Sequence, residues 1–387
     1  MLKASQDNSI YAEVISMGER VHIGKNSIVR AKEVIIGNDV VIGDNVDIVC
    51  DRLELGNGCK IGNNTTITTP DINLGAGCSI GKTVEVELNE YLHLGKSSVV
   101  GNRVVIGGQG MRSGEFLWMK NDVIVGGGGC AGPRSYLTTG DNVAIFDKCY
   151  INLSEAVTLG DGTALSYNVV LLTHGAWQPA LMGYPTKFGP VHVGKQCVVY
   201  LNSVVLPGVS IGDYATIGAS SLVNKDIPAH SLATGNPARV IKGSGEFPKA
   251  LTAEGIDILM HEIIADYATT LPPKDAEALE CRPDGTNFTL TTLFAGTKTH
   301  IVYYGQGTQA GQSTQPDVSI SYYPLPDELK GSTHFDINER KMTGDGNAIS
   351  EDLRDYLRRR AIKIFTGKQF RTIPLANLKR IKEKRKN

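Results

Sequence analysis

The sequence predicts a parallel β-helix over about residues 21–241, followed by a small α+β domain. Two observations support the β-helix: an aliphatic residue recurs at a fixed spacing of six, and β-branched residues dominate the repeated segments. Six is not the period of an α-helix, so we expect short strands joined by turns. The clearest run of the repeat consists of Val193, Val199, Val205, Ile211, Ile217 and Val223.

The same phase continues upstream, where three hexapeptides make one coil of a prism with three flat sides. Successive aliphatic residues there are Ile36, Leu55, Leu74 and Leu94. Each step exceeds three hexapeptides by one or two residues, which predicts extra residues at a corner. Gly-Asn pairs suit such corners because both residues tolerate positive φ. An ordinary β-sandwich would instead space its strands about 8–12 residues apart.

The repeat divides the chain into two predicted domains. Residues 1–243 form the β-helix, with loop insertions near 107–140 and 172–190. Residues 244–387 form an α+β accessory domain that ends in a basic tail from Lys368 onward. Within that domain we expect a helix in 254–271, strands between 288 and 344, and a second helix that Ser350 caps.

Charge and composition give no general reason to expect a nucleic-acid or membrane partner. The chain has 39 basic and 40 acidic residues, so it offers no general attraction for nucleic acid or membrane surfaces. We see no secretory signal and no apolar segment long enough to span a bilayer. The seven cysteines lack zinc-binding spacing. We therefore predict a cytoplasmic protein that requires no metal. Four cysteines fall in the small slot of the repeat and are expected to be packed inside: Cys59, Cys78, Cys149 and Cys197.

The two interruptions of the repeat are the candidate functional regions, because loops on a rigid scaffold commonly carry function. In the first, the run Gly126–Gly129 indicates a flexible turn or close backbone packing. The second reads LLTHGAWQPALMGYPTKFGPVHVG and begins at His174. We interpret His174 as functional. Trp177 and Tyr184 lie in the same loop, where they either form a wall for an acceptor substrate or anchor the loop.

Residues 142–243 resemble the hexapeptide-repeat acyltransferases, in particular the galactoside, maltose and xenobiotic acetyltransferases. The matching segments are VTLGDGTALSYNVVLLTHG and VVLPGVSIGDYATIGASSLVNKDIPAHSLATGNPARVIKG. The resemblance implies a left-handed β-helix, a homotrimer, and acetyl-CoA or another acyl-CoA bound between subunits. The acceptor would be a hydroxyl or amine of a sugar-like or other small molecule.

The resemblance also implies roles for individual residues. His174 matches the general base of a direct transfer, in which it removes the proton of the attacking group. Lys225 and Arg239 match contacts to the cofactor phosphates, and Ala219 matches a backbone contact to the pantetheine arm. In the sugar acetyltransferases an asparagine that helps to position the sugar hydroxyl stands at the position of Phe146. This chain has phenylalanine there. Tyr200 and Leu201 are larger than the residues that the family has near the thioester.

Two other functions fit a β-helix. The first is an assembly scaffold without catalysis, which the bulky Tyr200 and Leu201 and the extra C-terminal domain favour. The second is a zinc enzyme similar to the γ-carbonic anhydrases, which needs three converging imidazoles. His93 and His192 would have to join His174 in that site, since Pro179 stands where a histidine five residues after His174 would be.

Overall fold

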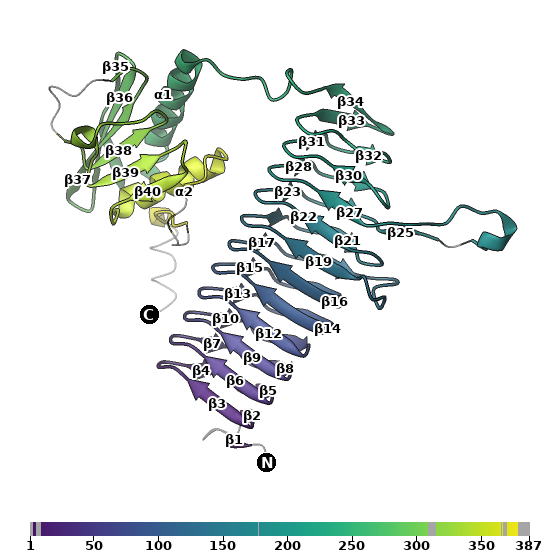
Figure 1. The fold of residues 1–387 in the computed structure, drawn as a ribbon. Helices are drawn as coiled ribbons and strands as arrows, with labels where there is room; N and C mark the ends of the chain where they lie inside the picture. Colours follow the sequence, from purple (N-terminus) through teal and green to yellow (C-terminus); the bar gives the residue numbers. More distant parts are fainter. Residues whose placement is uncertain are drawn as a thin grey trace. The chain divides into compact units, whose positions relative to one another are not determined.

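The computed structural model describes residues 3–4, 9–176, 178–308, 315–364, 366 and 370–377. The chain divides into two compact units, residues 1–249 and 250–387. The first unit is a stack of coils built from parallel strands, drawn purple to teal in Figure 1, and the second is a smaller α+β unit. The predicted fold class, a parallel β-helix followed by an α+β domain, is thereby confirmed.

The β-helix has three faces, and each coil contributes a short strand to every face. The first face contains β2 (Ile10–Ala12), β5 (Ile28–Arg30), β8 (Asp47–Val49), β11 (Thr66–Thr68), β14 (Glu85–Leu94), β16 (Val105–Ser113), β18 (Ile124–Gly126), β21 (Tyr150–Asn152), β24 (Val170–Leu171), β29 (Val204–Val205) and β32 (Leu222–Val223). The second contains β3 (Val14–Met17), β6 (Glu33–Ile36), β9 (Arg52–Leu55), β12 (Asp71–Leu74), β19 (Tyr136–Thr139), β22 (Val157–Leu159), β27 (Val191–Val193) and β30 (Ser210–Ile211). The long strands β14 and β16 pair on both of these faces.

The third face is a separate sheet. Its strands are β4 (His22–Ile23), β7 (Val41–Ile42), β10 (Lys60–Ile61), β13 (Ser79–Ile80), β15 (Val99–Val100), β17 (Trp118–Met119), β20 (Ala144–Ile145), β23 (Ala164–Leu165), β28 (Val198–Val199), β31 (Thr216–Ile217) and β33 (Leu232–Gly235). Antiparallel strands lie at both ends of the β-helix: β1 (Lys3–Ala4) pairs with β2, and β34 (Ala238–Lys242) pairs with β33.

The repeated aliphatic residues stack inside the coils as predicted. Ile36, Leu55 and Leu74 occupy successive positions of one column and are at most 3% exposed. Burying a side chain of this kind contributes about 1.5–3 kcal/mol, so the stack supplies the core of the unit. The four cysteines of the small slot are also buried, which confirms that they are packed residues. Burial raises the pKa of the Cys149 thiol to about 11.

Asparagines occupy the corners and bond to each other from coil to coil. Asn26, Asn45 and Asn64 all have φ between 55° and 58°. Their amides form a ladder, with Nδ2-to-Oδ1 distances of 3.2 and 3.0 Å. Positive φ is accessible to asparagine at little cost, which explains the residue choice at these turns.

The first interruption is shorter than predicted. Residues 107–126 continue the coils through β16, β17 and β18, and the residues between β18 and β19 form the actual insertion, 127–135. The second interruption lies between β24 and β27, where β25 (His174–Gly175) and β26 (Lys187–Phe188) form an antiparallel pair. We call residues 174–189 the arm, because Figure 1 shows this segment projecting from the stack of coils.

In its described residues the C-terminal unit contains the helices α1 and α2 and a mixed sheet of six strands in the order β35-β36-β37-β38-β39-β40. Its elements are α1 (Ala253–Thr269), η2 (Pro272–Lys274), β35 (Ala276–Asp284), β36 (Asn287–Phe294), β37 (Thr297–Tyr304), β38 (Val318–Ser321), η3 (Asp327–Leu329), β39 (Thr333–Asp336), β40 (Lys341–Thr343) and α2 (Ala348–Arg359). The prediction that Ser350 caps the second helix is wrong. Asn347 is the N-cap, and Ser350 is the third helical residue of a capping box. The predicted basic tail lies mostly outside the described residues.

Candidate active site

His174 lies at the base of the arm, where the chain leaves β24. Its backbone pairs with Phe188 and that of Gly175 pairs with Lys187, so the two ends of the arm are fastened together. The Phe188 ring stacks on the imidazole with a centroid distance of 5.7 Å and an interplanar angle of 21°. The imidazole is half-buried and therefore still accessible.

The imidazole is oriented by two side chains from the neighbouring coil. His174 Nδ1 lies 2.8 Å from Asn152 Oδ1 and 2.8 Å from Ser154 Oγ. Asn152 Nδ2 donates to the carbonyls of Gly126 and Gly128, at 3.3 and 3.0 Å, which assigns the amide orientation. Since Asn152 Oδ1 can only accept, Nδ1 carries the proton. In the neutral ring Nε2 is then free to accept a proton.

Further hydrogen bonds hold the orienting groups in place. Thr173 Oγ1 donates to Asn152 Oδ1 at 2.7 Å and accepts from the Glu155 backbone N–H at 3.1 Å. Ser154 Oγ donates to the Gly128 carbonyl at 3.0 Å, so its lone pairs face His174. Asn152 and Thr173 are fully buried. A buried network whose members all have partners gives the imidazole one defined orientation.

The two interruptions of the repeat meet at this corner. Arg134, from the first insertion, forms a bidentate ion pair with Glu155, beside Ser154. This guanidinium holds the pKa of the Glu155 carboxyl below its ordinary value. The Gly126–Gly129 run packs closely here. A Cβ on Gly127 would lie 2.2 Å from the Tyr150 hydroxyl, and one on Gly129 would lie 2.5 Å from Ser154 Oγ. The glycines therefore provide close backbone packing.

Sequence reasoning missed Asn152, Ser154 and Phe188. Phe146, where the resemblance places an asparagine, follows β20 and packs edge-on against Trp118. The asparagine that contacts His174 in this structure is Asn152. A signal was present in the spacing. The aliphatic residues run from Ile151 to Leu159 in a step of eight, and the extra residues form the corner that contacts His174.

The other predicted site residues lie at two places. Tyr184 is exposed on the arm, beyond the short helix η1 (Ala180–Met182), and Trp177 lies outside the described residues. Ala219 and Lys225 are exposed beside β31 and β32, and Arg239 is exposed on β34. Strand β32 is two strands from β24 on the first face, a separation of about 10 Å. The structure thus brings the three predicted cofactor contacts to the last coils, above His174.

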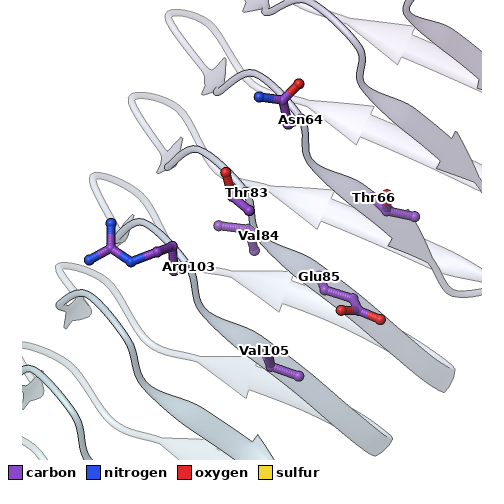
Figure 2. A pocket seen from close by; sticks show the side chains of 7 residues that line it. All are labelled: Asn64, Thr66, Thr83, Val84, Glu85, Arg103 and Val105. Carbon is purple, nitrogen blue, oxygen red and sulfur yellow. The ribbon is translucent and has the colours of Figure 1, made fainter.

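A shallow hollow of about 340 Å³ lies elsewhere on the β-helix, at the edge of the first face (Figure 2). Its lining residues are Asn64, Thr66, Thr83, Val84, Glu85, Arg103 and Val105. Thr66 is on β11, five strands from β24, or roughly 24 Å along the stack. The hollow is therefore separate from His174.

Two kinds of feature are absent from the described residues. Their helices include none that is long and apolar enough to cross a membrane. Within the same part of the chain, His, Cys, Asp and Glu side chains do not gather in threes as metal ligands would, so His93 and His192 do not join His174 in such a cluster.

Comparison with known proteins identifies the repeat. A family model for the hexapeptide repeat of succinyl-transferase matches residues 14–50, 33–69 and 190–225. The chain resembles the hexapeptide-repeat acyltransferases. Galactoside O-acetyltransferase of Escherichia coli is 33% identical over 126 residues, which are 28% of this chain and 58% of that protein. YvoF of Bacillus subtilis, named as a candidate acetyltransferase, is 33% identical over 101 residues, 26% of this chain and 56% of YvoF.

A solved structure belongs to the same group. The hexapeptide-repeat acetyltransferase VCA0836 of Vibrio cholerae, in complex with acetyl coenzyme A, aligns with 28% of this chain and 60% of its own at 24% identity and a TM-score of 0.26. The family model and the two curated relatives confirm the resemblance predicted from the sequence. The chain spans little more than half the length of the curated relatives described above, and most of this chain lies outside the aligned parts.

Proposed function

We propose that this protein is an acetyl-CoA-dependent acyltransferase that acts on a hydroxyl or amine of a sugar-like small molecule. The observation that carries the proposal is the orientation of His174. Asn152 holds the proton on Nδ1, which leaves Nε2 of this half-buried ring free to act as a general base. Relatives named as acetyltransferases support the reaction class.

The proposed transfer is direct, and His174 both removes and returns the proton. Nε2 takes the proton of the acceptor hydroxyl while that oxygen attacks the thioester carbonyl, and the new C–O bond forms. The tetrahedral intermediate carries an oxyanion, which backbone N–H groups would stabilise. The C–S bond then breaks, and the leaving thiolate takes the proton from the imidazolium. The products are the acetyl ester and coenzyme A, and the imidazole is neutral again.

The last coils would bind the cofactor. Lys225 and Arg239 are exposed cations suited to its phosphates, and Ala219 lies at an exposed turn whose backbone can bond to the pantetheine amides. Tyr200 and Leu201 are exposed at the turn after β28, on the same part of the β-helix. Their exposed positions allow either side chain to line the cofactor path.

The outward side of the first face supports association with other copies, as a homotrimer. In-register outward positions on β16, β18, β24, β29 and β32 are apolar, and Val105 and Ile124 are 40% and 42% exposed. The column also includes Tyr150 on β21, and its members are Val105, Ile124, Tyr150, Val170, Val204 and Leu222. The last four are half-buried, and together the column forms a largely apolar stripe of the kind found at interfaces. The arm also ends in apolar side chains, with Leu181 104% and Met182 73% exposed, which suits contact with a neighbouring subunit.

The free cysteines agree with the reducing cytoplasm as the location of the protein.

Release of coenzyme A thiol tests the proposal. Purified protein is mixed with acetyl-CoA and a panel of sugars and amines, and thiol formation is followed by its reaction with a chromogenic disulfide. We expect His174→Ala to lower kcat/KM by about 10²–10⁴-fold. His22→Ala, at an exposed position on the first coils, is the matched control. Equal rates of thiol release for the His174→Ala and wild-type proteins would show that His174 is not the general base. Absence of any heat on titration with acetyl-CoA would favour the non-catalytic scaffold.

A further inference from the structure

A group of aromatic side chains lies outside the site described above, on the second face of the β-helix. Tyr91 and His93 project outward from β14, Arg112 from β16 and Tyr136 from β19. The rings of Tyr91 and His93 stack at 4.8 Å, those of Tyr91 and Tyr136 at 6.1 Å, and both interplanar angles are below 30°. We call these four residues the aromatic shelf.

A glycine holds the central ring of the shelf against the coil. Gly110 lies between Tyr91 and Tyr136 in the register of the sheet. A Cβ at Gly110 would lie 2.9 Å from Tyr91 Cζ, closer than carbon atoms approach in proteins. The Tyr91 ring therefore covers the bare backbone of Gly110. The guanidinium carbon of Arg112 lies 5.2 Å from the centre of the same ring.

Carboxylates fix the edges of the shelf. His93 Nε2 lies 2.6 Å from Asp71 Oδ2, and the Tyr136 hydroxyl donates to Glu90 Oε1 at 2.7 Å. These bonds hold two rings that remain partly accessible, with the His93 side chain 24% exposed. The shelf is thus an organised surface of aromatic rings bordered by hydrogen-bonding groups.

A column of polar side chains connects the shelf with the arm. Arg112, Thr138, Thr158 and His192 occupy one outward column in register. The column runs from β16 to β27, the strand that follows the arm. From β14, which carries Tyr91, to β27 there are four strand steps, about 19 Å. A ligand that spans from the shelf to His174 would therefore be longer than a single sugar ring.

The chemistry of this surface suits a chain of pyranose rings. Aromatic faces carry negative charge density that attracts the C–H side of a sugar ring, while imidazole, hydroxyl and guanidinium groups bond to sugar hydroxyls. The carboxylates of Asp71, Glu90 and Glu54 outnumber the guanidiniums of Arg52 and Arg112 at this surface, which makes it unfavourable for polyanions such as nucleic acids. Another subunit of the same protein would be expected to bind at the apolar stripe on the first face instead of at this polar surface.

We propose that the aromatic shelf binds the pyranose rings of an oligosaccharide acceptor, one end of which reaches His174. The position of the reacting end rests on the proposed function, whereas binding to the shelf does not. The shelf would hold the unreactive part of the acceptor and so favour longer chains over monosaccharides.

Binding to the inactive protein tests the shelf separately from catalysis. The His174→Ala protein, without acetyl-CoA, is applied to a panel of linear malto-, chito-, xylo- and galacto-oligosaccharides from disaccharides to octasaccharides, and affinities are measured by calorimetry. We expect at least one series to bind, with affinity that rises with chain length. Tyr91→Ala and Tyr136→Ala should each weaken that binding about three- to tenfold.

Milder variants and a control distinguish binding from unfolding. Arg112→Ala changes an exposed side chain, and Gly110→Ala forces the Tyr91 ring off the coil, so both should weaken binding in a folded protein. Tyr11→Ala, on β2 of the first face, should leave it unchanged. The proposal is overturned if no oligosaccharide in the panel binds, or if the shelf variants bind as the parent protein does. A Tyr91→Ala protein that loses its oligomeric mass in light scattering would also overturn it, since the shelf would then be a subunit interface.

Discussion

Replacement of Asn152 by leucine tests whether one hydrogen bond makes His174 a base. Leucine has nearly the same shape but no Oδ1, so Nδ1 keeps only the Ser154 Oγ found 2.8 Å away in the structure. In the structure this hydroxyl donates to the Gly128 carbonyl at 3.0 Å, but in the variant it can turn and donate to Nδ1 instead. Both tautomers of the imidazole then become possible, and the one with its proton on Nε2 cannot accept a proton from the substrate.

The structure also bounds the effect on stability. Asn152 Nδ2 donates to two carbonyls. Gly126 keeps the Leu153 N–H at 3.2 Å, whereas Gly128 keeps Ser154 Oγ only while that hydroxyl does not turn to Nδ1. Thr173 Oγ1 retains the Asn152 backbone carbonyl at 3.0 Å. The Ser154 backbone N–H, 3.4 Å from Asn152 Oδ1, loses this acceptor, so the loss is about 1–3 kcal/mol. The variant should fold.

Loss of a hydrogen bond to the ring of the proposed base should cost about 1–3 kcal/mol of transition-state stabilisation. This corresponds to a decrease of roughly fivefold to 150-fold in kcat/KM. The assay is thiol release from acetyl-CoA with the best acceptor, and circular dichroism verifies folding. Asn57→Leu, which removes an acceptor of the Asn38 N–H at an exposed corner after β9, is the control. Wild-type kcat/KM in a folded Asn152→Leu protein would refute the reasoning.

Three further predictions concern stability and reactivity. Asp352→Ala removes a buried carboxylate that bonds Lys274 Nζ at 2.6 Å and Thr372 Oγ1 at 2.7 Å, so the C-terminal unit should lose about 3–5 kcal/mol in urea titrations; a loss below about 1 kcal/mol would contradict this. Arg134 lowers the folded-state pKa of Glu155, so this pair stabilises the fold above the unfolded pKa of about 4.3 and its contribution is lost as pH falls through the folded value. The wild-type protein should therefore melt at a higher temperature than Glu155→Gln near neutral pH, and this difference in Tm should shrink in acid. A difference in Tm that is the same at all pH values would contradict the prediction. Exposed Cys281 should react with iodoacetamide before buried Cys149, as peptide mass spectrometry would show, and prior labelling of Cys149 would count against the packing described here.

The C-terminal unit shows the limits of local pattern. The helix expected in 254–271 is α1 at Ala253–Thr269, because its apolar residues recur at helical spacing. Strand β35 was missed. It is an edge strand whose residues are mostly exposed, so its sequence, AEALECRPD, carries little apolar alternation, and its pairing with β36 defines it instead.

The sequence by itself determined the β-helix, since a period of six requires one aliphatic side chain per strand to point into the same narrow core. It also singled out His174, which stands where that period is interrupted. Only the tertiary structure decided the partners of His174, because Asn152 and Ser154 are about twenty residues away and reach the imidazole through the stacking of one coil on the next. The aromatic shelf has the same origin: Tyr91 and Tyr136 are distant in the chain, and coil register alone places them on either side of Gly110.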